Sequence, residues 1–343
     1  MSYTALARRY RSTGFDDIVG QEPIARTLQA AIKADRVAHA YLFTGTRGVG
    51  KTTMARVFAK ALNTGSDEVE QAIMTGQDTD VIEIDGASNN SVDDARELIA
   101  NSVYRPMRGP YKIYIIDEVH MLSTAAFNAL LKTMEEPPEH VKFILCTTES
   151  HKLPATIQSR CQRYDFRTIP APIIADRLAF VVKNEGLEAE PELLSMVARL
   201  GNGSMRDALS ILDRLMASGE KKLTTPMIEQ MLGMAPRELV GALIDAFASG
   251  EPKAALEAAG ELIASGVSPD QLFEALIDRL RDLMVLSACG PETSLVELTG
   301  EMRTQEIERA GKFDSPALVH MIALCERVQR SAKSSPNPRA LLD

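Results

Sequence analysis

The sequence predicts an α/β domain with a parallel sheet in its N-terminal half, followed by two all-helical parts. Between about residue 40 and residue 166, short apolar runs alternate with stretches of helical periodicity. This alternation is typical of a parallel sheet with helices on both faces. After Pro172 the strand patterns stop, and amphipathic helical segments separated by Gly, Pro and Ser follow to the end. We therefore expect domains at residues 1–169, 170–220 and 221–343.

Four apolar runs followed by turn or capping residues are the strand candidates: Ala40–Thr44, Val81–Asp85, Lys112–Asp117 and residues 142–147. Helical patterns lie between them at residues 52–61 and Thr124–Glu135. In the second pattern, one apolar face recurs at intervals of three and four residues, formed by Phe127, Leu130, Leu131 and Met134. Ser123 is its expected N-cap.

Composition and charge exclude several classes of protein. The 343 residues are 45% hydrophobic and 25% charged, which excludes a fibrous or disordered chain. We find no membrane-spanning run and no secretory signal, and expect a cytoplasmic protein. The net charge of −9 argues against coating nucleic acid through a basic surface. Its distribution is uneven: residues 1–170 hold 20 basic and 21 acidic side chains, and the remainder hold 18 and 26.

The four cysteines do not form a C-x-x-C pair or another spacing typical of metal ligands; they are Cys146, Cys161, Cys289 and Cys325. We expect reduced thiols and no zinc site.

Residues 45–52 read GTRGVGKT and match G-x-x-x-x-G-K-[ST] in full. An apolar strand precedes them and a helical pattern follows. The glycines allow successive backbone N–H groups to face a phosphate, and the helix N-terminus adds to that field. Lys51 would reach the β- and γ-phosphates, and the Thr52 hydroxyl would bind Mg²⁺.

A second candidate group lies at the end of the strand pattern Lys112–Asp117. Asp117 suits Mg²⁺ coordination, either directly or through one of the ion's ligands, and Glu118 suits polarisation of an attacking water. Together with the glycine-rich loop, this pair predicts hydrolysis of a nucleoside triphosphate.

Three further side chains could contact the γ-phosphate or the water. Thr148 follows the fourth strand pattern, Arg160 follows a short helix, and Arg206 lies in the first turn of a helix that Ser204 would cap. Spacing alone leaves open whether either arginine acts at the site or is an ordinary surface charge.

These residues resemble one family closely: the γ/τ subunits of the bacterial DNA polymerase III clamp loader, which are AAA+ ATPases. The resemblance covers most of residues 1–220. It is carried by Ala7–Arg11 and by the runs FDDIVGQE, HAYLFTGTRGVGKT, YRPMRGPYKIYIIDEVHML, FNALLKTMEEPPEHVK, TTESHKLPATIQSRC and GSMRDAL. The DEVHML and SRC runs are more specific than a phosphate-binding loop alone. The final third is similar to the family's helical collar only loosely.

The resemblance implies a role for each matching position. Asp117 and Glu118 would be the Walker B pair, Thr148 sensor 1 and Arg206 the sensor 2 arginine of a helical lid. Arg160 would act in trans, in the ATP site of a neighbouring subunit. The residues implied to bind ATP are Ala7, Arg11, Val19, Gly45, Thr46, Arg47, Gly48, Val49, Gly50, Lys51, Thr52, Thr53 and Arg206.

The resemblance also implies partners: δ and δ′ subunits, other copies of this chain, a sliding clamp and primer–template DNA gripped by the assembled ring. ATP binding would open the clamp, and hydrolysis would release it on DNA. The family's four-cysteine zinc module, which follows the helix after the phosphate loop, is absent here, because residues 64–80 contain no cysteine. Zinc is therefore not implied. We expect a fragment, because the chain ends at Leu341-Leu342-Asp343 in what reads as the start of a helix.

Two alternatives remain at this point. One is another AAA+ motor acting on DNA, in branch migration or helicase loading. The other is a structural clamp-loader subunit without catalysis, which would be expected to lack a working phosphate loop.

Overall fold

The computed structural model describes residues 4–293, 295–296, 298 and 300–334. Within them the chain forms two compact units. The first comprises the described residues up to Glu185 together with Val197–Arg214, and the second comprises Gly186–Met196 and the described residues from Leu215 onward. None of the helices in these ranges combines the length and the apolar character needed to cross a membrane.

The first unit is built on a five-stranded sheet, in which every neighbouring pair is parallel and the order is β2-β3-β4-β1-β5. The strands are β1 (Ala40–Thr44), β2 (Val81–Asp85), β3 (Lys112–Asp117), β4 (Val141–Thr147) and β5 (Gln162–Asp165). Thr44 pairs with both Thr147 and Asp165, and Asp85 pairs with Asp117. The carboxyl ends of all five strands therefore meet at one edge of the sheet.

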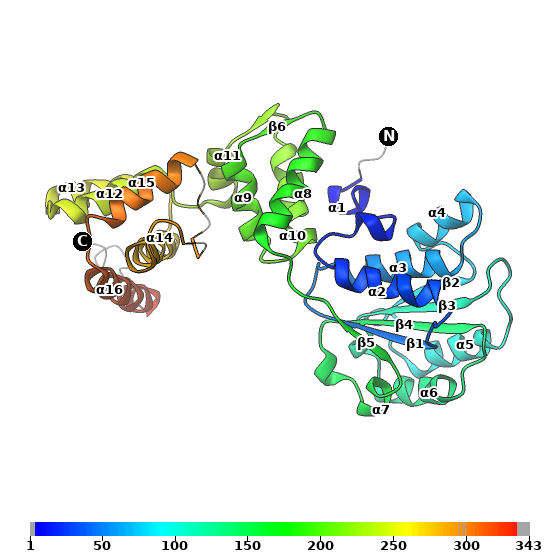
Figure 1. Ribbon diagram of the computed structural model, residues 1–343. Coiled ribbons are helices and arrows are strands. Elements are labelled where there is room, and N and C mark those ends of the chain that lie inside the picture. Colours follow the sequence, from blue (N-terminus) through cyan, green and yellow to red (C-terminus); the bar gives the residue numbers. More distant parts are fainter. Residues whose placement is uncertain (1–3, 294, 297, 299, 335–343) are drawn as a thin grey trace. The chain divides into compact units, whose positions relative to one another are not determined.

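Helices cover both faces of this sheet, as the alternating pattern predicts (Figure 1). One face carries α2 (Glu22–Lys33), α3 (Lys51–Leu62) and α4 (Asp67–Thr75), and the other carries α5 (Val92–Ser102), α6 (Thr124–Glu135) and α7 (Ala155–Gln158). Strand side chains alternate between the two cores: Tyr41 and Phe43 pack toward the first group, and Ala40 and Leu42 toward the second. Burial of both sides explains why β1, β3 and β4 are almost continuously apolar.

Among the described residues, three short 3₁₀ helices lie at strand ends or in loops: η1 (Phe15–Asp17), η2 (Val119–Met121) and η3 (Ser150–Lys152). Two of them follow β3 and β4 directly, at the edge where the strand ends meet. They hold the chain close to this edge after each strand.

The first unit is completed by α1 (Leu6–Arg9), α8 (Ala171–Asn184) and most of α10 (Met205–Met216). Polar contacts tie α1 to the other two helices. The Leu6 amide donates to Asp213 Oδ2 at 3.3 Å, Tyr10 donates its hydroxyl to Glu185, and Arg9 forms an ion pair with Glu185 at 2.5 Å.

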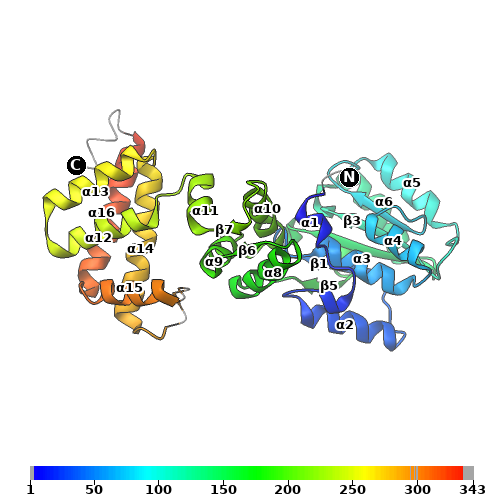
Figure 2. The ribbon, with the colours of Figure 1, turned by 90° about the horizontal axis from the view of Figure 1, so that it is seen from above.

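The second unit is predominantly helical, as Figure 2 shows. It contains α11 (Thr225–Leu232), α12 (Arg237–Ser249), α13 (Pro252–Ala264), α14 (Pro269–Cys289), α15 (Gly300–Ala310) and α16 (Ser315–Ser334). The long helix α14 packs against α15 and α16, and a buried ion pair joins Arg279 to Glu306. Helix α9 (Pro191–Leu200) has residues in both units.

The fold class predicted from the sequence is confirmed, with several local differences. Strand β5 was not predicted, because Gln-Arg-Tyr-Asp at the sheet edge has no apolar pattern. Helix α4 was not predicted either. The expectation of helices alone after Pro172 was wrong for two residue pairs, β6 (Glu188–Ala189) and β7 (Lys222–Leu223), which form a small parallel ladder too short for any periodicity.

Helix α6 keeps its predicted bounds and its Ser123 cap, whose hydroxyl accepts from the Ala126 amide at 3.2 Å. Leu131, predicted in its apolar face, is only half-buried, because that face is narrower than expected. The expected start of a helix at residues 341–343 lies outside the described residues.

Candidate nucleotide-binding site

The glycine-rich loop, Asp117 and Thr148 meet because of the strand order. The loop follows β1, Asp117 ends β3, and Thr148 comes directly after β4. Since β4 lies between β1 and β3, Thr147 and Thr148 lie between the loop and the two carboxylates. Ligands of open α/β sheets bind at this kind of edge.

Gly48 allows the loop to contact helix α10. Its φ of +77° lies in the left-handed region, and a Cβ built on it would be 1.9 Å from Ser204 Oγ. Ser204 Oγ in turn accepts from the Asp207 amide at 3.2 Å, as the predicted cap requires, and the Arg206 amide donates to the Gly48 carbonyl at 3.4 Å. The first turn of α10, with Arg206, is therefore packed directly on the phosphate loop.

Lys51 is buried at the start of α3. Its Nζ donates to the Gly45 carbonyl at 2.9 Å and to the Thr46 carbonyl at 2.8 Å, which holds the ammonium against the loop. Burial lowers the pKa of Lys51, and the neighbouring Glu118 carboxylate opposes this effect. The ammonium is thus only partly compensated by protein charge, and a phosphate would compensate it further.

Thr52 and Asp117 offer oxygen ligands to a cation. Thr52 Oγ1 donates to Asp117 Oδ2 at 2.6 Å. Burial raises the pKa of Asp117, against the hydrogen bond from Thr52. A hydroxyl and a carboxylate side by side, beside a loop shaped for phosphate, are the hard oxygen donors that Mg²⁺ prefers, so the residues present fit this ion.

Glu118 has a positive φ of +45°, which is unusual for a residue with a Cβ. Its Oε2 accepts from the Thr148 amide at 3.3 Å and from the Thr148 hydroxyl at 3.0 Å. The Thr148 hydroxyl is therefore directed to the carboxylate, rather than to the position expected for a phosphate.

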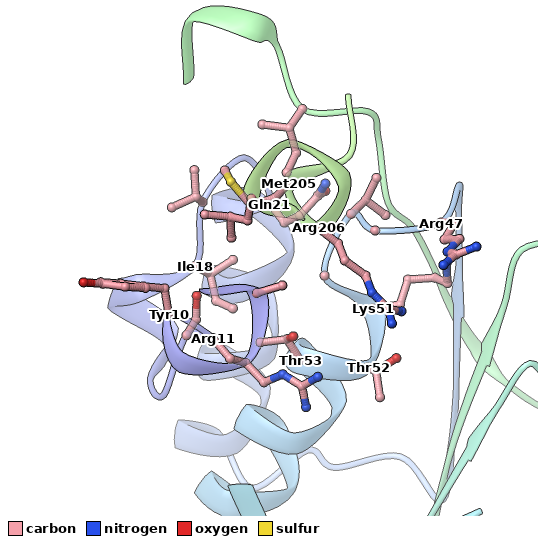
Figure 3. Close-up of a pocket in the computed structure, with 18 of the residues that line it drawn as sticks. Tyr10, Arg11, Ile18, Gln21, Arg47, Lys51, Thr52, Thr53, Met205 and Arg206 are labelled. Atoms are coloured by element: carbon pink, nitrogen blue, oxygen red, sulfur yellow. The ribbon is translucent and has the colours of Figure 1, made fainter. Parts of the chain in front are cut away.

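A cavity of about 420 Å³ opens above the loop, within the size range of ligand pockets (Figure 3). Eight charged side chains line it: Arg8, Arg11, Arg47, Lys51, Arg177 and Arg206, with Asp117 and Glu118. These give a net formal charge of +4, which suits a polyanion such as a triphosphate.

The side chains of Lys51 and Arg206 converge in Figure 3, and Arg11 points toward Thr53 from the side of α1. Burial lowers the pKa of Arg11, and the nearby Arg56 lowers it further. A bound anion near Thr53 would relieve the cost of this buried guanidinium.

Most residues expected to bind nucleotide line this cavity; they are Ala7, Arg11, Val19, Arg47, Gly48, Val49, Gly50, Lys51, Thr52, Thr53 and Arg206, joined by Asp117 and Glu118. Gly45 and Thr46 do not line it, although their carbonyls hold Lys51. Thr148 does not line it either.

Arg160 lies away from the cavity. Its guanidinium forms an ion pair with Glu135 at 2.6 Å and donates to the Thr156 carbonyl at 2.7 Å. It does not take part in the site of its own chain.

Sequence reasoning missed other lining residues: Ala5, Arg8, Tyr10, Ser12, Ile18, Gln21, Phe166, Ile169, Arg177, Met205, Leu209 and Ser210. Of these, Ile18, Met205 and Leu209 had a usable signal, because they belong to the FDDIVGQE and GSMRDAL runs, and so did Gln21. It is buried, and its amide donates to the Arg167 carbonyl at 2.6 Å. Arg177 had no such signal.

In the described part of the chain no three His, Cys, Asp or Glu side chains form a group that could hold a metal ion. All four cysteines are free, and Cys146 is fully buried in β4.

The fold and the site together define a P-loop protein of the AAA+ class. A solved structure of the RuvB Holliday junction branch migration motor from Thermotoga maritima is similar, with a TM-score of 0.51 and 19% identity. The match covers 69% of this chain and 80% of that one. At this identity the likeness shows the fold alone, so it does not favour branch migration.

Three family descriptions match successive parts of the chain. Residues 20–170 match "DNA polymerase III, delta subunit", and residues 173–221 match "DNA polymerase III clamp loader subunit, ATPase lid domain". Residues 223–343 match "DNA polymerase III subunits gamma and tau domain III". The last match falls on the part of the chain for which the sequence resemblance was weakest.

The chain belongs to the family of DNA polymerase III gamma and tau subunits, as its motifs predicted. It is 38% identical to the gamma subunit of Buchnera aphidicola, over 84% of this chain and 81% of that protein. It is 40% identical to the tau subunit of Bacillus subtilis, over 100% of this chain. The chain spans 62% of the length of that tau subunit.

Proposed function

We propose that this chain is the ATP-driven motor subunit of a DNA polymerase III clamp loader, which opens the sliding clamp and loads it on primer–template DNA. One observation carries the proposal: the phosphate loop, both carboxylates and Arg206 surround one cavity with a net charge of +4. Family membership directs this chemistry to clamp loading rather than to another AAA+ function.

In this proposal Lys51 and Arg206 contact the terminal phosphates, and Thr52 and Asp117 hold Mg²⁺. When bound, Mg²⁺ neutralises phosphate charge that develops during hydrolysis. Glu118 orients and polarises the attacking water. Ala7 and Val19 form the wall for the adenine, and we place Arg11 toward the phosphates, because it points toward Thr53 (Figure 3).

Arg160 is proposed to act in the ATP site of a neighbouring copy. Its distance from its own cavity and its position on the surface support this assignment, since its contact with Glu135 is half-exposed and contributes little stability.

The proposed partners are δ and δ′ subunits, further copies of this chain, the clamp and primed DNA. We retain domain limits at residues 1–169, 170–220 and 221–343, ATP and Mg²⁺ as cofactors, no zinc, and a cytoplasmic location.

The test compares Lys51→Ala with Lys60→Ala, a control on the same helix whose ammonium pairs with Glu70 at 3.1 Å outside the cavity. Lys51→Ala should lose ATP binding by at least tenfold, and Lys60→Ala should bind as the unmodified chain does. Equal ATP binding by both variants would contradict the proposed site.

Clamp loading is tested separately, with the chain assembled with δ and δ′. Primed DNA and clamp together should stimulate ATP hydrolysis, and a ring carrying Arg160→Ala should bind ATP but hydrolyse it slowly. A ring that hydrolyses ATP without binding the clamp would point to a different AAA+ motor.

A further inference from the structure

The carboxylate of Glu118 is held asymmetrically. All its polar contacts are at Oε2: the Thr148 amide donates at 3.3 Å, the Thr148 hydroxyl donates at 3.0 Å, and His120 Nδ1 lies 3.4 Å away. Within the described residues, no donor contacts Oε1. One oxygen is thus anchored to the protein, and the other is left for a ligand of the cavity that Glu118 lines.

His120 is buried between the ends of β3 and β4, with only 8% of its side chain exposed. Besides Glu118, its Nδ1 lies 3.0 Å from Thr147 Oγ1, and its Nε2 lies 3.9 Å from Glu149 Oε2. Thr147 Oγ1 also accepts from the Glu149 amide at 3.0 Å. His120 therefore bridges the carboxylate and the three-residue segment 147–149.

We propose that His120 is a positioning residue for Glu118, a proposal that rests on ATP hydrolysis as the function of this site. An Nδ1–H group shared between Thr147 Oγ1 and Glu118 Oε2 adds a further anchor to the carboxylate oxygen that Thr148 already holds. Oε1 is then turned to accept a proton from water. Such fixation matters because a general base displaced by a fraction of an ångström loses much of its effect.

The first test replaces His120 and measures ATP binding and single-turnover hydrolysis in the assembled ring. His120→Ala should lower the hydrolysis rate by about tenfold and change ATP affinity by less than about twofold, because the cavity lining is intact. His120→Asn should restore most of the rate, since its amide nitrogen can occupy the position of Nδ1. His120→Gln, which instead replaces Nε2, should not.

His140 provides the matched control: it is also partly buried, its Nε2 lies 3.2 Å from the Ser102 carbonyl, and it does not line the cavity. His140→Ala should hydrolyse ATP at the unmodified rate.

A double-mutant cycle with Glu118→Gln separates positioning from general damage to the fold. If His120 acts through Glu118, His120→Ala should cause no further loss in the Glu118→Gln background. Additive losses, or loss of ATP affinity in His120→Ala, would overturn the inference. An unmodified ring that binds ATP without hydrolysing it would refute the proposed function, and the inference with it. A hydrolysing ring that tolerates His120→Ala would refute the inference alone.

Discussion

Gly48→Ala should separate helix α10 from the phosphate loop. The added methyl group would lie 1.9 Å from Ser204 Oγ and 3.0 Å from Ser204 Cβ, and 3.3 Å from Arg206 Cβ. Contacts this short cannot persist, so the first turn of α10 must shift. Because Arg206 lies in that turn, the shift should move the guanidinium away from the cavity.

The expected loss in the free energy of unfolding has two parts. A residue with a Cβ at a φ of +77° costs about 1–2 kcal/mol, partly offset by the lower entropy of the unfolded chain. Overpacking against Ser204 adds about 1–3 kcal/mol. Gly50→Ala isolates the first part, because Gly50 has a φ of +98° with no other atom within 4 Å of the added Cβ.

The assay is urea unfolding of the full chain without nucleotide, followed by circular dichroism, together with hydrogen exchange of the amides at the start of α10. Gly48→Ala should lower the free energy of unfolding by about 1–3 kcal/mol more than Gly50→Ala does, and only Gly48→Ala should accelerate exchange in α10. Equal effects of the two variants on both measurements would refute the packing argument.

Two further predictions concern stability. Burial lowers the pKa of Lys142, whose ammonium lies 4.9 Å from the centre of the Tyr111 ring. At pH values between the pKa of this lysine in the folded chain and its pKa in the unfolded chain, the unfolded chain therefore binds more protons. Lys142→Met should therefore raise the free energy of unfolding at pH 7. This gain in stability over the unmodified chain should shrink as pH rises toward the pKa of an unfolded lysine. Thermal melts of both proteins from pH 7 to pH 10 test this, and a difference in stability that does not change with pH would contradict it. Asp80→Asn should destabilise the chain by about 2 kcal/mol, because the buried carboxylate accepts hydrogen bonds from three loop amides. Hydrogen exchange of these amides should accelerate, and unchanged protection would contradict this role of Asp80. Those amides belong to Met107, Arg108 and Gly109.

The sequence was most informative where one local pattern determines both structure and chemistry. The four apolar strands and the GTRGVGKT loop each depend on neighbouring residues alone, and the structure places them as predicted, with β4 starting one residue early. Strand β5 shows the opposite case. Its polar residues form a strand because β1 offers a free edge, and no property of Gln-Arg-Tyr-Asp indicates that edge.

The side-chain partners within the site were less predictable than its members. The sequence predicted that Thr148 lies near the γ-phosphate or the attacking water. Its hydrogen bonds to Glu118 could not be predicted in the same way, because they depend on β4 lying beside β3. Likewise, Arg8 and Arg177 reach the cavity through the packing of α1 and α8. Long-range packing of this kind leaves no spacing in the sequence.

The cavity charge also bears on which anions the protein attracts. Since the whole chain carries −9 and the charged cavity lining +4, the remaining residues carry −13. At physiological salt, fields beyond about 8 Å are screened, so a small anion entering the cavity responds mainly to the local positive lining. A long polyanion spread over the surface meets the negative remainder as well. The charge distribution thus favours a small anion in the cavity over random adsorption of a long polyanion on a single chain.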